Sequence, residues 1–270
     1  MVPQPLDGVP LEFEPGTDPR AAFVKWAIDS ENFSGAMVNR LWKHFFAVGL
    51  VEPVDDLRAS NPPSNPELWK VLNNEFRNHR FDLRHIIRLI LNSRAWQLDS
   101  TNTPENELDG KYYSHYYAKR LPAEVMLDAI ASATDVPNRF PGYPVGLRAT
   151  QIADPAVDSY FLTLFGRSDR VTACACERKG EVTLPQLLHL SNDENLITNI
   201  RSQEGRLAKL LENPDSDIVI AEIFLATVSR LPSDAERKAV RDALTAENRN
   251  EVFADLFWAL LNSKEFAFNH

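Results

Sequence analysis

Residues 34–48 read SGAMVNRLWKHFFAV, and this stretch sets the fold class of the chain. Its large apolar side chains recur at helical spacing: Met37, Val38, Leu41, Trp42, Phe45 and Phe46. Residues three and four apart share one face of an α-helix, so the pattern predicts a helix with a broad core-facing stripe. Glycine commonly closes a helix, and Gly49 is therefore the expected end.

Similar helical patterns extend on both sides of this helix. Asp18 and Pro19 predict a helix over residues 19–29, because aspartate is a common N-cap and proline suits the first helical position. Further helix starts are predicted at Pro66, Asp82, Pro122 and Pro185. The fold class is therefore all-α, in the form of an irregular multi-helix domain.

One stretch, 136–182, interrupts the helical pattern. Residues 136–146 hold three prolines and two glycines, and residues 147–182 have the weakest helical periodicity. We expect a partly extended, loop-rich insertion there. Residues 1–18 are proline-rich and are expected to form an extended linker. Two organisations stay open for 19–270: a single helical domain, or two helical halves that divide near 136–182.

Two short segments repeat one pattern. Residues 89–96 read LILNSRAW, and residues 259–266 read ALLNSKEF. Each ends an apolar helix and continues with Asn-Ser, a basic residue, a spacer and an aromatic residue. The pattern is typical of a helix end at which Asn or Ser caps a short following helix and the aromatic side chain packs back. Duplication of a helical half is the alternative.

Composition excludes several classes of function. The formal net charge is −9 and the basic residues are dispersed, so nucleic acid is not an expected partner. A hydrophobic fraction of 44% and a charged fraction of 25% are ordinary for a globular protein. No apolar run reaches the about 18 residues that a membrane-spanning helix needs. The first residues show no signal-peptide pattern.

The motifs of common cofactors are missing from the sequence. There is no Cys-x-x-Cys-His motif for haem and no P-loop or dinucleotide fingerprint. Three histidines, His79, His85 and His115, show no metal-ligand spacing such as His-Glu-x-x-His. The cofactor is therefore left unknown, and whether the chain is an enzyme stays open.

The segment CACER, residues 174–178, contains both cysteines of the chain. On an extended segment Cys174 and Cys176 would face the same side, because strand side chains alternate. Two such thiolates suit a soft metal ion, with His189 as the nearest downstream candidate ligand. A disulfide between them would close a strained, easily reduced ring. Structural thiols are the third alternative.

Three polar residues lie on the less apolar side of the first quoted helix: Asn39, Arg40 and His44. Asp55 and Asp56 follow closely and are placed to fold back onto them. One hypothesis is a pocket that binds an anion or a sugar. The favoured interpretation is a buried polar network that holds the following turn against the helix.

Arg120, Glu124 and Asp128 are spaced one helical turn apart. Two carboxylates at this spacing are a candidate acid–base pair. The favoured interpretation is an Arg120–Glu124 ion pair that fixes the junction between loop and helix.

Four arginines gather in the least regular stretch: Arg148, Arg167, Arg170 and Arg178. Arginine clusters bind carboxylates or phosphates through paired hydrogen bonds. They equally tie loops to the C-termini of helices.

Seven segments carry a family resemblance: NRLWKHFFAVGLVEPVDDLR (39–58), NPPSNPELWKVL (61–72), RLPAEVMLDAI (120–130), FGRSDR (165–170), CACER (174–178), LPQLLHLSND (184–193) and LLNSKEFAFNH (260–270). In this order they resemble the planctomycete PSD-one domain family, the domain of unknown function number fifteen fifty-three. The resemblance runs from about residue 19 to the C-terminus. It implies the C-terminal part of a larger, exported protein and an extracytoplasmic location. It supplies no catalytic residues.

Two functional hypotheses follow. The first is a non-catalytic interaction or scaffold module of an exported multidomain protein, which docks another domain of the same polypeptide or a glycan. The alternative is a redox or metal-dependent enzyme domain with its site around the segment Cys174–Arg178.

Overall fold

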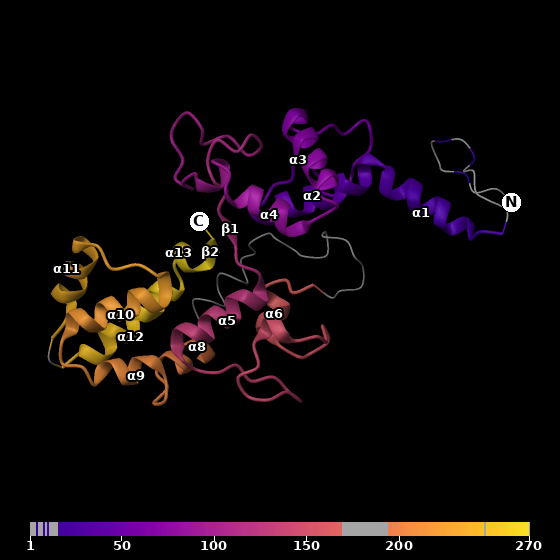
Figure 1. The fold of residues 1–270 in the computed structure, drawn as a ribbon. Helices are drawn as coiled ribbons and strands as arrows, with labels where there is room; N and C mark the ends of the chain where they lie inside the picture. Colours follow the sequence, from indigo (N-terminus) through magenta and orange to yellow (C-terminus); the bar gives the residue numbers. More distant parts are fainter. Residues whose placement is uncertain are drawn as a thin grey trace. The chain divides into compact units, whose positions relative to one another are not determined.

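The computed structural model describes residues 16–168, 194–245 and 247–269, together with Gln4, Gly8 and Pro10. Helices dominate these residues, so the mainly α-helical fold class predicted from the sequence is confirmed (Figure 1). Contacts between residues divide the chain into two compact units. Unit 1 runs up to Ala118 and unit 2 is Lys119–Asn269. One alternative from the sequence is a division into two helical halves near 136–182. The described part of that stretch lies within unit 2.

In the described part of unit 1, three α-helices start where the sequence signals predict, whereas the helix of the quoted stretch 34–48 starts earlier, at Glu31. The helices in its described part are α1 (Pro19–Asp29), α2 (Glu31–Phe46), α3 (Pro66–Asn78), α4 (Leu83–Leu91) and the short 3-10 helix η1 (Ala95–Gln97). Asp18, Asn65 and Asp82 each cap the following helix by accepting a backbone N–H with the side chain. The helix over 19–29 and the helix starts at Pro66 and Asp82 are therefore confirmed.

The core of unit 1 forms around the aromatic stripe of α2. Trp42 and Phe46 are buried, and their rings stack with centroids 4.2 Å apart. Phe76 of α3 and Ile86 and Ile90 of α4 are buried in the same cluster. Burying large apolar side chains is the main stabilising term of a domain, each contributing about 1.5–3 kcal/mol. The stripe at 34–48 thus organises this unit.

The end of α2 differs from the prediction. The helix ends at Phe46, and Ala47, not Gly49, has the left-handed backbone, with φ of 66°. Gly49 serves another purpose, because a Cβ there would lie 2.7 Å from the carbonyl oxygen of Val51 and 3.0 Å from Oδ1 of Asn39. A glycine is required at this position by the close approach of the following turn.

Unit 2 is closed by a pairing of its two ends. Strand β1 (Lys119–Arg120) pairs antiparallel with β2 (Phe268–Asn269). Between them lie α5 (Ala123–Thr134), η2 (Ala149–Gln151), α6 (Tyr160–Leu164), α8 (Glu194–Ile200), α9 (Arg206–Leu211), α10 (Ser216–Val228), α11 (Asp234–Ala243), α12 (Arg249–Leu261) and α13 (Lys264–Ala267). The helix predicted to start at Pro122 is α5, for which Pro122 is the N-cap.

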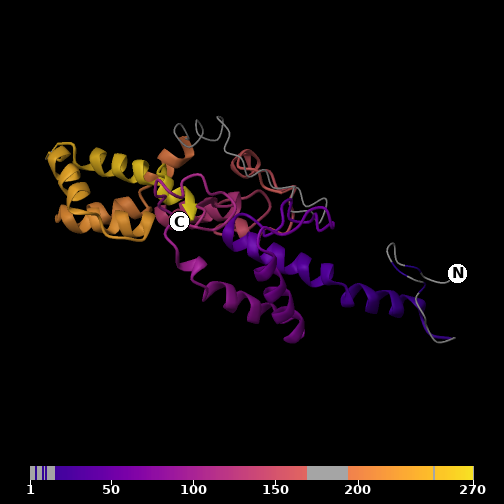
Figure 2. The same cartoon turned by 90° about the horizontal axis from the view of Figure 1, so that it is seen from above.

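The core of unit 2 is centred on α10, which lies beside α12 (Figure 1 and Figure 2). Ile223 and Phe224 of α10 and Phe253 and Phe257 of α12 are almost completely buried. The loop-rich stretch also contributes buried side chains to this core: Phe140, Ala149, Ile152 and Val157. In the described part of the chain, no helix combines the length and the apolar character needed to cross a membrane.

The two repeated segments form the same helix end, one in each unit. Asn92 donates its side-chain amide to the carbonyl of Arg88 (2.8 Å), and Asn262 donates to the carbonyl of Trp258 (2.9 Å). The hydroxyls of Ser93 and Ser263 then accept the N–H of the aromatic residue three positions on, at 3.3 Å and 3.1 Å. The predicted capping device is therefore confirmed at both places.

Candidate functional site

The turn between α3 and α4 brings together three side chains with metal-binding groups. Arg80 and Phe81 both have left-handed backbone angles, with φ of 54° and 60°, and they reverse the chain direction. Glu75 lies on α3, His79 is the residue that ends this helix, and His85 lies in the first turn of α4. The helix itself places His79 against Glu75, and the reversal brings His85 to the same carboxylate.

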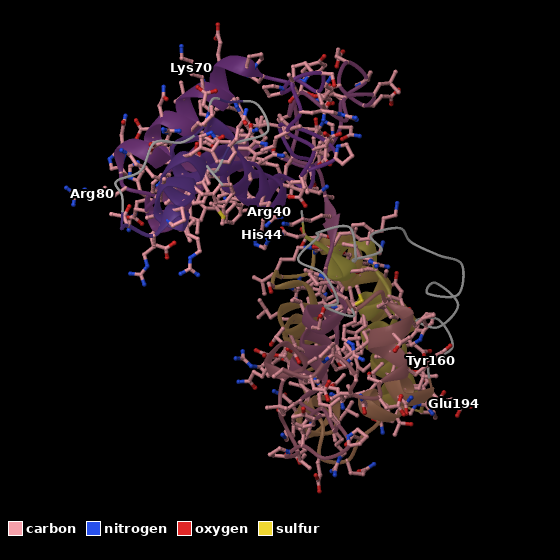
Figure 3. All side chains as sticks on the ribbon, turned by 90° about the vertical axis from the view of Figure 1, so that its right-hand side faces the viewer. Arg40, His44, Lys70, Arg80, Tyr160 and Glu194 are labelled. Carbon is pink, nitrogen blue, oxygen red and sulfur yellow. The ribbon has the colours of Figure 1, made fainter. Side chains whose placement is uncertain are left out.

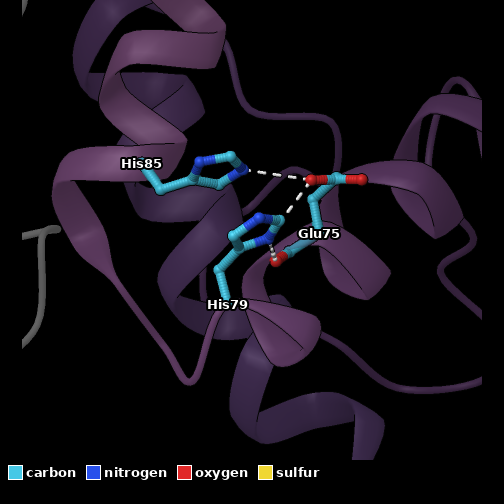
Figure 4. A group of neighbouring side chains, drawn as sticks. All are labelled: Glu75, His79 and His85. Carbon is cyan, nitrogen blue, oxygen red and sulfur yellow. Dashed lines mark hydrogen bonds and ion pairs between the residues drawn. The ribbon is translucent and has the colours of Figure 1, made fainter.

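The three side chains form a compact cluster (Figure 4). The Nε2 atom of His85 lies 3.0 Å from Oε2 of Glu75, and Nδ1 of His79 lies 2.9 Å from the backbone carbonyl oxygen of Glu75. The two imidazole rings are stacked, with centroids 3.6 Å apart and an interplanar angle of 15°. One ring nitrogen from each histidine and one carboxylate oxygen lie within 4.8 Å of one another.

The cluster is accessible to solvent. The side chains of His79, Glu75 and His85 are 47%, 36% and 28% exposed. The sequence does not predict this cluster, because its three residues do not have the His-Glu-x-x-His spacing. One part of the cluster can be seen in the sequence, because Glu75 and His79 have the i, i+4 spacing that places two side chains on one helix face. The contribution of His85, six residues further on, depends on the turn.

Asn39 and Arg40 hold the turn that follows α2. Asn39 is fully buried; its amide donates to the carbonyls of Val51 and Val54, both at 2.8 Å, and its oxygen accepts the N–H of Val51. Arg40 donates to Asp55 at 2.7 Å. These contacts correspond to the favoured interpretation of Asn39 and Arg40, a polar network that holds the following turn against the helix.

His44 lies one turn beyond Arg40 on α2, and Figure 3 labels both side chains. Its ring packs edge-on against Phe45, with centroids 5.1 Å apart. The structure therefore brings Arg40 together with Asp55, whereas the contact shown for His44 is an aromatic one.

Asp128, the second carboxylate of the candidate acid–base pair, already has backbone and side-chain hydrogen-bond donors. Asp128 accepts hydrogen bonds from the N–H of Ala149 and of Thr150, from the Thr150 hydroxyl and from Asn138. It thus ties η2 and the loop-rich stretch to α5. Glu124, one turn earlier, is buried.

Arg120 and Arg167 both bind carbonyl oxygens within unit 2. Arg120 donates to the carbonyl of Phe165 at 3.2 Å and lies over the Phe165 ring, and burial lowers its pKa. Arg167 donates to the carbonyl of Val157 at 2.6 Å. The first contact joins β1 to the C-terminal end of α6, and the second joins the residues on either side of α6.

The remaining candidates lie outside the described residues: Arg170, Cys174, Cys176, Arg178 and His189. The alternatives for the two thiols and the hypothesis of a redox or metal-dependent enzyme around them stay predictions. The predicted linker, 1–18, also lies mostly outside the described residues.

Helix α1 presents an apolar surface. Seven of the eleven residues in PRAAFVKWAID are Ala, Val, Ile, Phe or Trp, yet none of the eleven is buried. Phe23 and Val24 are 50% and 51% exposed. The C-terminal end of α1 is anchored, because Arg77 of α3 donates twice to the carbonyl of Asp29. The rest of α1 extends beyond the other helices of unit 1 (Figure 2).

A hollow in unit 2 combines apolar and polar side chains. It is lined by Leu127, Ile130, Asn138, Arg139, Phe140, Ser159, Tyr160, Phe161, Asn195, Leu196 and Asn199. Tyr160 is 68% exposed and, like Glu194, projects from the surface in Figure 3. Exposed aromatic rings beside amides are suited to stacking on and hydrogen-bonding to polar ring compounds.

Comparison with known proteins gives one match. The family model PSD1, described as a protein of unknown function (DUF1553), matches residues 19–244. No curated protein and no solved structure matches the chain.

Proposed function

We propose, from the premise that this chain belongs to the DUF1553 family of proteins of unknown function, that it is a non-catalytic interaction module. Its docking surface is α1 together with Phe33 and Met37 of α2, and we call this the α1 surface. The partner is another domain of the same polypeptide.

The exposure of α1 is the observation that carries the proposal. A helix in water normally buries one apolar face, because tertiary packing supplies most helical stability. On the α1 surface Phe23, Val24, Phe33 and Met37 are between 38% and 51% exposed. Contiguous exposed apolar patches are typical of surfaces that bind another protein, and the proposal is that these four side chains form one.

The family resemblance supports the choice of partner. It implies an exported, extracytoplasmic, multidomain protein in which this domain follows other modules. A neighbouring domain is held at a high effective concentration, so a modest apolar contact is enough for docking. Export and a multidomain context are parts of the proposal.

Hydrogen exchange on the full-length gene product tests the docking. The amides of residues 19–29 should exchange more slowly there than in the chain 1–270 alone, because docking protects the helix. The double substitution F23D/V24D should remove this difference. Leu108→Asp is the matched control, since Leu108 is 93% exposed on a loop of the same unit and outside the α1 surface. Equal exchange in the two proteins, or a gene that encodes no other domain, would contradict the proposal.

The hollow beside Tyr160 favours a second candidate function, glycan binding. Tyr160 supplies an exposed ring, and Asn138, Arg139 and Asn199 supply hydrogen-bonding groups. Binding on a glycan array that Tyr160→Ala abolishes is the expected result. An array without any specific signal would remove this candidate.

A further inference from the structure

The side chains of the Glu75–His79–His85 cluster carry metal-binding groups, and the proposed docking of the α1 surface does not involve them. We propose that these three side chains bind one divalent transition-metal ion, with Zn²⁺ as the representative of the class. The proposal is independent of the α1 surface, because it concerns the turn between α3 and α4.

The donor set fits this class of ion. Two imidazole nitrogens and one carboxylate oxygen form the His₂Glu set that holds zinc in proteins. Two donors at about 2.0–2.1 Å from a tetrahedral ion are about 3.3 Å apart. The separation of Nε2 of His85 and Oε2 of Glu75, at 3.0 Å, is close to this value. One ring nitrogen of each histidine and one carboxylate oxygen already lie within 4.8 Å of one another, and rotation of the stacked rings would turn their lone pairs towards one ion.

The backbone prepares His79 for this role. Its Nδ1 lies 2.9 Å from the carbonyl oxygen of Glu75, and a carbonyl can only accept, so Nδ1 carries the proton. The lone pair is then on Nε2. A ligating histidine commonly donates its other N–H to a backbone carbonyl in this way, which orients the ring before the ion binds.

The cluster is also accessible to an ion. The three side chains are between 28% and 47% exposed, so an ion can reach them from solvent. Arg80 follows His79 directly, but its side chain extends away from the helices in Figure 3. Three protein donors leave one position of a tetrahedral ion for water or a small anion.

Zinc titration of the purified chain tests the proposal. The parent protein carries C174S/C176S and no polyhistidine tag, so that neither thiols nor added histidines bind the ion. The variants H79Q, H85Q and E75Q each remove one donor and keep a polar side chain. Glu67→Gln is the matched control, because Glu67 is an exposed carboxylate in the first turn of the same helix.

We expect the parent and the E67Q control to bind one Zn²⁺ per chain, and each of the three variants to bind at least about tenfold more weakly. Co²⁺ in place of Zn²⁺ should give the intense visible bands of a four-coordinate site. Binding that is absent in the parent, or unchanged in the three variants, would overturn the proposal.

Histidine ring NMR on the parent protein gives a second measurement that needs no donor variant. Zinc should shift the ring nitrogen signals of His79 and His85 and leave that of the buried His115 in place. Unchanged signals from His79 and His85 would show that the cluster is only a hydrogen-bonded stack.

Discussion

Individual polar residues in this chain differ in what they stabilise, although they look alike in the sequence. Asn39 and Arg40 are neighbours, and both were candidates for one polar pocket. Asn39 is fully buried and bonded to Val51 and Val54, whereas the Arg40 side chain is 43% exposed and paired with Asp55. A buried group left without its partner costs far more than an exposed ion pair contributes.

Substitution of these two residues should therefore have unequal effects. Asn39→Ala leaves the N–H and carbonyl of Val51 and the carbonyl of Val54 unsatisfied, and we expect it to lower the free energy of unfolding by about 2–4 kcal/mol. Arg40→Ala should lower it by less than about 1 kcal/mol. Urea unfolding of the two variants checks this, and equal losses would show that Asn39 is not the structural residue of the pair.

At the scale of elements, one device ends a helix in both units. The Asn-Ser step stops α4 and α12, and the serine hydroxyl caps the short helix that follows. The device depends only on residues within one turn of one another. This local character explains why the pattern could be interpreted correctly before the fold was known.

Removal of either serine cap should cost a similar amount. We expect Ser93→Ala and Ser263→Ala each to lower the free energy of unfolding by about 1 kcal/mol, because each leaves a backbone N–H without its acceptor. Ser93→Thr and Ser263→Thr keep the hydroxyl and are the controls. Differential scanning calorimetry measures the change, and a serine variant as stable as its threonine control would contradict the capping role.

At the scale of the molecule, ion pairs join elements that are far apart in the sequence. In unit 2, Arg230 follows α10 and donates to Glu236 of α11 and to Glu265 of α13. The hydrogen bonds from Arg230 lower the pKa of Glu236 to about 2, from an ordinary value of 4.5. The Glu236 side chain also accepts the N–H of Ser233 and so completes a capping box for α11.

This shift of the Glu236 pKa predicts a pH dependence of stability. The folded carboxyl group stays ionised at a pH at which the unfolded one binds a proton, so its contribution is complete above about pH 4.5 and is lost as the pH falls towards about 2. Glu236→Gln should be less stable than the wild type at pH 7, and the difference should shrink across this window. Chemical unfolding at several pH values measures it, with Glu222→Gln on the exposed side of α10 as control. A stability difference between Glu236→Gln and the wild type that does not change with pH would contradict the lowered pKa of Glu236.

Features that depend on near neighbours could be predicted from the sequence. The helix over 19–29, the caps at Asp18 and Asp82 and the Asn-Ser helix ends are confirmed, because helix periodicity and capping involve residues within about one turn. The end of α2 was misplaced because the tight approach of Val51 to Gly49 comes from a turn that packs back, not from the helix itself.

The candidate metal cluster was not predicted, because no local pattern contains it. Glu75 and His79 share a helix face, but His85 joins them only after Arg80 and Phe81 reverse the chain. Amino-acid order alone therefore determined the fold class, several helix starts with their caps, and the aromatic stripe of α2. The packing of those helices determined which distant polar groups meet, since such contacts depend on chain reversals and core packing that no short window of sequence encodes.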